Sequence, residues 1–237
     1  MNIAIILAAG SGTRMGNASK PKQFLMIYNK PLIVHTIEAF EMHDEIDYLL
    51  VVTNKEYIDE VKVYTKQFDL SKVRYIIEGG ASRQESVYKA IMFLKGLNID
   101  DDDNIIIHDA ARPLISQNII SDNVKACSTF GAVDTVIPSS DTIIRSIDNA
   151  TIDSIAKRSE LFLGQTPQSF KFKIILEAHE HAKRVGNNLA TDDCRLVLDI
   201  GKKIHLVNGS KLNFKITTFD DLMILKALLK LGKSEVI

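Results

Sequence analysis

The hydrophobic positions of the chain form short β-branched runs that alternate with longer stretches of helical spacing. Continuous apolar runs are typical of parallel strands covered on both faces. The runs that predict strands are Ile3–Leu7, Tyr48–Thr53, Val73–Glu78, Asn104–His108, Ala132–Ile137 and Lys203–Asn208. The stretches that predict helices are Pro31–Met42, Lys55–Phe68, Arg83–Lys95, Ile119–Phe130 and Lys171–Val185. This alternation predicts an α/β fold with a doubly wound, mostly parallel twisted sheet.

The pattern changes at about residues 138–159, where a β-hairpin is predicted. Residues 141–147 and 151–155 are the two strand candidates, and Asp148-Asn149-Ala150 is the turn between them. A hairpin that projects from an α/β domain would expose its apolar side chains. We therefore expect this arm to pack against a partner.

Composition narrows the ligands that the chain can bind. Hydrophobic residues make up 46% and charged residues 25% of the 237 residues, as in soluble globular proteins with a sizeable core. Length alone allows one large domain or two small ones. The formal net charge is −1, so no global field attracts nucleic acid or an anionic membrane. A polyanionic ligand must be held by a local cluster of cations.

Cysteine usage and the N-terminus favour a cytoplasmic location. Cys127 and Cys194 form no CxxC pair, which argues against a zinc site or a disulfide framework. The N-terminal apolar run is much shorter than the ~20 residues that cross a bilayer, and no basic segment precedes it. We expect neither a nucleic-acid partner nor a membrane partner.

A glycine-rich segment, Ala8-Ala9-Gly10-Ser11-Gly12-Thr13-Arg14-Met15-Gly16, follows the first predicted strand. Its backbone N–H groups would form an anion cradle at the carboxyl end of a parallel strand. It has no Walker sequence, and a dinucleotide fingerprint would need its third glycine where Met15 stands. Arg14 and Lys22 suit a triphosphate with a departing pyrophosphate. A tight turn with incidental surface cations is the alternative.

Two further segments follow predicted strands. In His108-Asp109-Ala110-Ala111-Arg112-Pro113, Asp109 can hold a magnesium ion that bridges phosphates, and Arg112 can contact phosphate. The alternative is a salt-bridged turn, and His108 is expected to satisfy a local hydrogen bond rather than act as a base. In residues 79–86, Gly79 and Gly80 allow close approach of a base or ribose, although a plain strand-helix turn has the same spacing.

The ordered motifs together resemble a known family. They are Leu7–Gly16, Pro21-Lys22-Gln23-Phe24, Gly79-Gly80 with Arg83 and Ser86, His108–Pro113, Asp141-Thr142, Gln165-Thr166-Pro167-Gln168, Thr191-Asp192 and Lys215-Ile216-Thr217. Over nearly its whole length the chain resembles the 2-C-methyl-D-erythritol 4-phosphate cytidylyltransferases of the isoprenoid-forming methylerythritol phosphate pathway. It also resembles their close relatives, the ribitol-5-phosphate cytidylyltransferases.

The resemblance implies a single Rossmann-like domain over residues 1–237, of the nucleotide-diphospho-sugar transferase type. It also implies CTP and Mg²⁺ as co-substrate and cofactor, and a homodimer joined through the hairpin arm. The implied catalytic residues are Arg14, Lys22, Arg158 and Lys215. The implied CTP-binding residues are Ala8, Ala9, Gly10, Gly12, Gly80, Ser86 and Ala110. The implied acceptor-binding residues are Arg112, Thr142, Thr166 and Thr191, with Thr142 and Arg158 reaching across the dimer, and Asp109 binds the metal.

The motifs point to different acceptors. Ala110-Ala111, Arg145 and Thr191-Asp192-Asp193 resemble the methylerythritol enzymes. Ser140 in place of a basic residue, Ala132-Val133-Asp134-Thr135, Gly164–Gln168 and Asp193-Cys194 resemble the ribitol group. The balance favours conversion of methylerythritol phosphate and CTP to 4-diphosphocytidyl-2-C-methyl-D-erythritol and pyrophosphate. The alternative product is CDP-ribitol for cell-wall or capsule polymers.

Two other classes stay open. A sugar-phosphate nucleotidyltransferase that uses UTP, TTP or GTP shares the glycine-loop architecture, and a nucleotide-binding module without catalysis is the second. The non-catalytic module is disfavoured by the combination of Arg14, Lys22 and Asp109, because binding alone would not need all three. Transfer chemistry needs no general base, since an acceptor phosphate is already anionic, but it needs cations that position two repelling anions.

Overall fold

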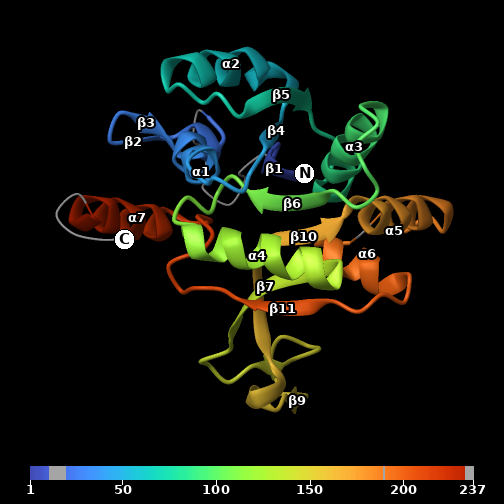
Figure 1. Cartoon of the computed structure of the whole chain (residues 1–237). Helices are drawn as coiled ribbons and strands as arrows, with labels where there is room; N and C mark the ends of the chain where they lie inside the picture. Colours follow the sequence, from blue (N-terminus) through green and yellow to red (C-terminus); the bar gives the residue numbers. More distant parts are fainter. Residues whose placement is uncertain (11–19, 189, 233–237) are drawn as a thin grey trace.

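A seven-stranded sheet forms the centre of the molecule, with strand order β11-β7-β10-β6-β1-β4-β5 (Figure 1). The computed structural model describes residues 1–10, 20–188 and 190–232. The strands are β1 (Asn2–Ala8), β4 (Tyr48–Thr53), β5 (Val73–Glu78), β6 (Asn104–Asp109), β7 (Ala132–Pro138), β10 (Phe162–Lys171) and β11 (His205–Asn208). Only β10 runs antiparallel to its neighbours in this sheet.

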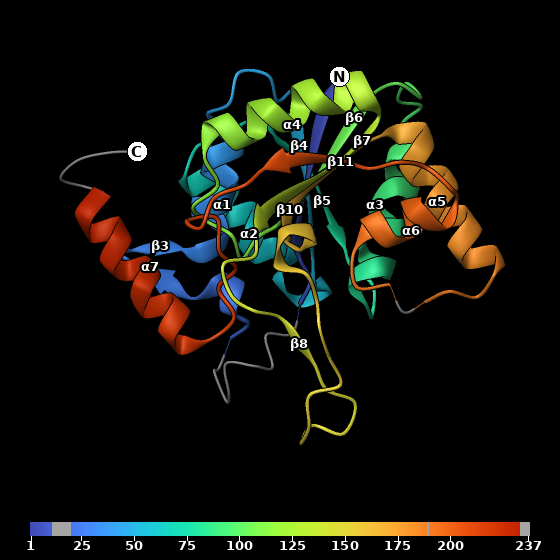
Figure 2. The same ribbon diagram turned by 90° about the horizontal axis from the view of Figure 1, so that it is seen from below.

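Helices cover both faces of the sheet (Figure 2). The helices on one face are α1 (Leu32–Glu41), α2 (Ile58–Gln67) and α4 (Gln117–Phe130). Those on the other face are α3 (Arg83–Gly96), α5 (Phe172–Arg184) and α6 (Asp193–Asp199). The last helix, α7 (Phe219–Gly232), packs beside the small hairpin of β2 (Met26–Ile27) and β3 (Lys30–Pro31). Short 3-10 helices lie at Lys22–Phe24, Lys55–Tyr57 and Arg158–Glu160.

The central strands are buried on both faces, which explains their continuous apolar runs. Every residue of β4 and β6 is buried. The parallel register pairs Leu7 with Asp109 and Ala8 with Thr53, so the carboxyl ends of β1, β4 and β6 lie together. The start of the glycine-rich segment, Ala8–Gly10, and the His108–Pro113 segment therefore meet at one edge of the sheet.

The predicted fold class is confirmed, but β10 and two helices were not predicted. β10 carries Gly164 and Pro167 among polar residues, so its sequence lacks the pattern of a central strand. It is held by pairing to β6 and β7, and its register shifts between Gly164 and Gln168. Its polar side chains find partners inside the fold, and tertiary pairing outweighs local propensity. The helices α6 and α7 are the other two additions.

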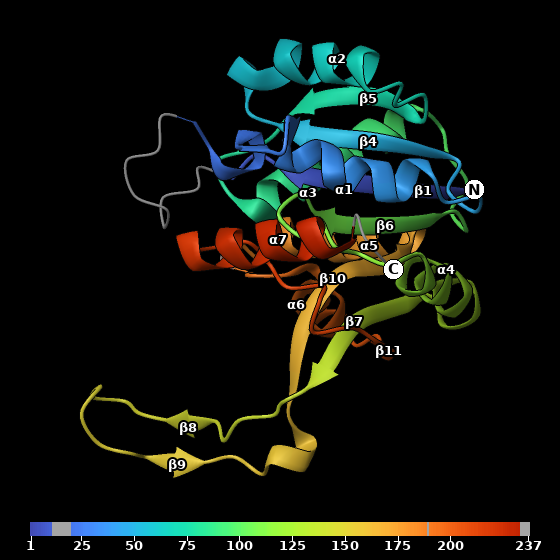
Figure 3. The same ribbon diagram turned by 90° about the vertical axis from the view of Figure 1, so that its left-hand side faces the viewer.

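The predicted hairpin is present, with shorter strands than expected. β8 (Ile144–Arg145) pairs antiparallel with β9 (Ser154–Ile155), Ile144 opposite Ile155. Figure 3 shows this arm standing away from the sheet and its helices. In the described part of the chain, no helix is both long and apolar enough to span a bilayer.

Candidate active site

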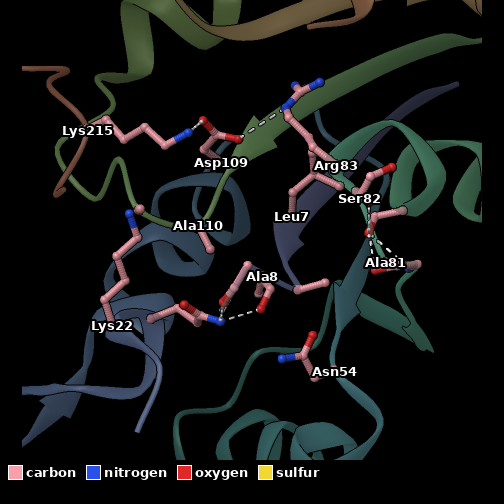
Figure 4. Close-up of a pocket in the computed structure, with 16 residues that line it drawn as sticks. Leu7, Ala8, Lys22, Asn54, Ala81, Ser82, Arg83, Asp109, Ala110 and Lys215 are labelled. Atoms are coloured by element: carbon pink, nitrogen blue, oxygen red, sulfur yellow. Dashed lines mark hydrogen bonds and ion pairs between the residues drawn. The ribbon is translucent and has the colours of Figure 1, made fainter. Parts of the chain in front are cut away.

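A pocket of about 500 Å³ opens where the ends of β1 and β6 meet the turns before α3 and α7 (Figure 4). Its walls come from the end of β1, the 3-10 helix at Lys22–Phe24, the residue after β4, the turn that opens α3, and the segment after β6 with a lysine from the C-terminal region. Its lining residues include Ala8, Ala9, Gly10, Lys22, Gln23, Asn54, Gly80, Ser82, Arg83, Ser86, Asp109, Ala110 and Lys215.

The start of the glycine-rich loop is fixed by a buried glutamine. The Gln23 side-chain Nε2 donates to the carbonyl oxygens of Ala8 at 2.6 Å and Gly10 at 2.9 Å. Two carbonyls are thereby turned toward Gln23, which holds the chain at the exit of β1 in one conformation. The predicted residues Gly12 and Arg14 lie outside the described residues.

The turn before α3 brings its backbone close to the loop because it has no side chains there. A Cβ on Gly79 would stand 2.5 Å from the Ala9 Cβ, and one on Gly80 would stand 2.4 Å from Glu85. The Gly80 N–H donates to the Ser86 hydroxyl at 3.0 Å, and Ser82 caps the helix by accepting from Glu85 N. Both glycines are therefore needed for the shape of this wall.

Asp109 is the centre of the charged groups. Its carboxylate lies 2.7 Å from the Lys215 ammonium, 3.8 Å from the Arg83 guanidinium and 3.9 Å from that of Arg112. Figure 4 shows Lys215 and Arg83 reaching it from opposite sides. Burial alone would raise the pKa of Asp109, but the charges of Lys215 and Arg83 lower it below its ordinary value. The carboxylate is ionised at neutral pH.

Arg83 is in turn held from behind by a buried pair. Its Nη1 donates to Asp193 at 2.6 Å, and the other Asp193 oxygen lies 3.0 Å from the His179 ring. Burial tends to raise the pKa of Asp193, and the Arg83 charge outweighs it and lowers that pKa. The arrangement connects α5 and α6 to the pocket through Arg83.

His108 is locked in place rather than available as a base. Its Nε2 faces the Arg112 carbonyl at 3.1 Å, so this nitrogen must carry the proton. Its Nδ1 then accepts from the Thr166 hydroxyl at 3.0 Å, while Thr166 accepts from the Asp109 N–H at 3.1 Å. Burial lowers the pKa of His108 to about 4. The expected local hydrogen-bonding role is confirmed, and the ring is neutral near pH 7.

The structure gathers most of the predicted residues and separates others. Ala8, Ala9, Gly10, Lys22, Gly80, Ser86, Asp109, Ala110 and Lys215 line the pocket. Arg112 and Thr166 lie behind Asp109, as their contacts show. Thr142 and Arg158 are exposed on the arm, and Thr191 lines a different surface hollow with Asp192.

Sequence reasoning assigned no role to Gln23, Asn54 or Arg83. Gln23 and Arg83 belonged to recognised motifs, and Asn54 directly follows a predicted strand, where open α/β sheets bind ligands. That position at a strand end was the available signal for Asn54. For Arg83, no local signal exists, because its partners Asp109 and Asp193 are distant in the sequence.

Comparisons with known protein families and relatives show what this chain is similar to. A family model described as 2-C-methyl-D-erythritol 4-phosphate cytidylyltransferase matches residues 2–231. The ribitol-5-phosphate cytidylyltransferase of Lactiplantibacillus plantarum is 40% identical over 231 residues, which cover 97% of this chain and 99% of the relative.

Solved structures show the same architecture. The 4-diphosphocytidyl-2C-methyl-D-erythritol synthase of Anaerococcus prevotii superposes with a TM-score of 0.81 at 27% identity, covering 97% of this chain and 96% of the other. The 2-C-methyl-D-erythritol 4-phosphate cytidylyltransferase of Thermus thermophilus superposes with a TM-score of 0.74 at 28% identity, covering 97% and 100%. The chain therefore belongs to the 2-C-methyl-D-erythritol 4-phosphate cytidylyltransferase family, and it is a nucleotidyltransferase that uses CTP as a substrate.

Proposed function

We propose that this enzyme transfers the cytidylyl group of CTP to the phosphate of D-ribitol 5-phosphate, forming CDP-ribitol and pyrophosphate. The observation that carries the choice of acceptor is the 40% identity, over almost the full length of both chains, to a relative named for ribitol 5-phosphate. The solved structures named for the methylerythritol acceptor or its product are 27% and 28% identical. The sequence motifs alone favoured methylerythritol phosphate. The 40% identity to the relative named for ribitol 5-phosphate now favours ribitol 5-phosphate as the acceptor.

Methylerythritol phosphate is the second candidate. Ala110 and Ala111, which precede Arg112, resemble the enzymes that use it, and both alanines line the pocket. Both acceptors are phosphorylated polyols, so one cationic pocket can accept the phosphate of either. The difference must be recognised along the carbon chain.

The pocket supports nucleotidyl transfer without a general base. We propose that the CTP triphosphate lies against Ala8–Gly10 and that the base and ribose lie against Gly80 and Ser86. Lys22 and Lys215 then lie beside the bond between the α-phosphate and the departing pyrophosphate, where negative charge builds up. The acceptor phosphate oxygen attacks this phosphorus, the bond to pyrophosphate breaks, and the cations neutralise the added charge. Arg14 would add a further cation, although its position lies outside the described residues.

The single carboxylate of Asp109 fits a magnesium ion completed by substrate. Among the described residues, no group of three or more histidine, cysteine, aspartate or glutamate side chains could hold a metal. Mg²⁺ is commonly bound by one or two carboxylates together with substrate phosphates and water. We propose that Asp109 holds Mg²⁺ together with CTP. Bound there, the ion would neutralise phosphate charge.

The arm supports a homodimer of single-domain chains. Ile144, Ile147, Ile152 and Ile155 are 53%, 70%, 59% and 61% exposed on a hairpin with no covering element in the described structure. We propose that a second copy of the chain covers these side chains. Thr142 and Arg158 would then complete the partner's acceptor site, since neither lines the pocket of its own chain.

An acceptor panel tests the proposal. The protein is incubated with CTP, Mg²⁺ and either D-ribitol 5-phosphate or 2-C-methyl-D-erythritol 4-phosphate, and pyrophosphate release is followed. We expect kcat/KM for ribitol 5-phosphate to be higher by roughly tenfold or more, the range that one altered group in a pocket gives. A preference for methylerythritol phosphate would overturn the choice of acceptor. A preference for UTP, TTP or GTP over CTP in the same assay would contradict the use of CTP.

A further inference from the structure

One carboxylate near the site has no ion-pair partner. Asp134 on β7 stands opposite Gln168 on β10, whose amide donates to it at 3.1 Å. The Cys194 thiol of α6 also hydrogen-bonds to it. No cation of the described residues forms an ion pair with Asp134, and Asp192 adds like-charge repulsion. Its side chain is only partly exposed.

This environment destabilises the charged carboxylate. Burial raises the pKa of Asp134 to about 6, and Asp192 adds to the shift, while the Gln168 hydrogen bond opposes it. A carboxyl group with a raised pKa lowers the stability of the folded chain as pH rises from its ordinary value toward the raised one. A carboxylate whose ionisation is costly does not stabilise the fold through its charge at neutral pH. Stabilisation by its charge therefore does not explain Asp134.

Gln168 holds the carboxylate in a defined orientation. The Asp193 backbone N–H can only donate, and it donates to the Gln168 Oε1 at 3.3 Å. The amide group must therefore present its Nε2 to Asp134. The other carboxylate oxygen, Oδ2, faces Gly164, where even an added Cβ would stand 3.6 Å away. Lone pairs on this carboxylate remain available for a ligand.

Asp134 lies within electrostatic range of Arg112, the arginine expected to bind the acceptor. It and Arg112 are close enough for each to shift the pKa of the other. The Arg112 Nε is buried without a hydrogen-bond partner among the described residues, and it lies 3.9 Å from Asp109. Cys194, which contacts Asp134, lines the hollow that also holds Thr191. Asp134 is thus linked by charge to Arg112 and by a hydrogen bond to Cys194, which lines the Thr191 hollow.

We propose that Asp134, oriented by Gln168, recognises the polyol chain of the acceptor by accepting hydrogen bonds from its hydroxyl groups. This inference rests on the proposed function. An acceptor whose phosphate lies beside Asp109 and Lys215 extends its carbon chain past Arg112 toward Asp134. A carboxylate accepts from hydroxyls and gains nothing from a methyl group. It therefore favours an acceptor whose five carbons all carry oxygen over one whose fifth carbon is a methyl group.

The test is Asp134→Asn, which keeps the shape and removes the charge. The KM for D-ribitol 5-phosphate should rise roughly tenfold to a hundredfold, as expected for loss of a hydrogen bond to a charged group. The KM for CTP should not change. The melting temperature at about pH 8 should be equal to or higher than that of the wild type, because the costly charge is gone. Asp122→Asn removes an exposed carboxylate of α4 and serves as the matched control.

Two results would overturn the proposal. One is an acceptor KM within about twofold of wild type, since a lost charged hydrogen bond should cost more. The other is a lower melting temperature with both KM values raised together, which would indicate a structural role. The wild-type acceptor panel decides the proposed function separately. If the wild type prefers methylerythritol phosphate, the proposed function fails, and the ratio of variant to wild-type KM for that acceptor still decides the role of Asp134.

Discussion

Asp109 shows how a single residue gathers charge from three parts of the chain. Lys215, Arg83 and Arg112 surround it, and each comes from a different element or turn. The sequence predicts Asp109 and Arg112 because both follow a strand. It does not predict the Arg83 contact, because that ion pair depends on how α3 packs against the sheet. The same is true of Asp134, whose neighbours come from β10 and α6.

Loss of the Lys215 ammonium should slow the transfer step. Lys215→Ala should lower kcat by about a hundredfold, by analogy with the loss of one donor that stabilises transition-state charge. Steady-state measurement of pyrophosphate release checks this. Lys211→Ala removes an exposed lysine from the same segment and should leave kcat unchanged. Equal rates for both variants would contradict the role given to Lys215.

Among the helices and strands, the sequence pattern predicts those that bury a regular apolar face. The strands β1, β4 and β6 are recognisable because consecutive apolar side chains fill both faces of the sheet. β10 is not recognisable, because its polar residues are satisfied by partners that only the folded molecule provides. Thr166 and Gln168 illustrate this, since their hydrogen bonds reach β6, β7 and α6.

Gly79 before α3 and Gly96 at the end of α3 predict contrasting effects of one added methyl group. Gly79→Ala should weaken CTP binding and lower the melting temperature, because the new Cβ would stand 2.5 Å from the Ala9 Cβ. Overpacking of this kind costs roughly 1–3 kcal/mol. Gly96→Ala adds the same methyl group at the end of α3, where nothing lies within 4 Å, and should leave CTP affinity unchanged. Thermal unfolding and CTP titration of both variants check this, and equal effects would disprove the packing argument.

At the scale of the whole molecule, the arm bears on both dimer formation and activity. Its exposed isoleucines call for a partner surface, and Thr142 and Arg158 lie on the arm rather than in the pocket. The sequence predicts the hairpin because its two strand runs flank a turn. It does not predict the surface that we propose covers the arm, because that surface would belong to another molecule.

Mixing two inactive variants tests whether the arm completes a partner's site. Arg158→Ala has an intact pocket and a defective arm, and Lys215→Ala has the reverse. After unfolding together and refolding, mixed dimers contain one site with both residues, so activity should return to about a quarter of wild type in a two-fold symmetric dimer. Each variant refolded alone is the control. No recovery, with dimers present by sedimentation, would show that Arg158 does not act across the interface.

The antiparallel direction of β10 has a consequence for how binding events communicate. Because β10 returns directly beside β7, pairing Phe162 with Pro138, the arm is the distal end of one long ribbon. The base of that ribbon carries Asp134 and Thr166. In the proposed dimer, contact between the two arms and occupation of the two acceptor sites would therefore bias the same ribbon. By linkage, an acceptor that favours the assembled ribbon must tighten the dimer by the same factor by which dimerisation tightens acceptor binding.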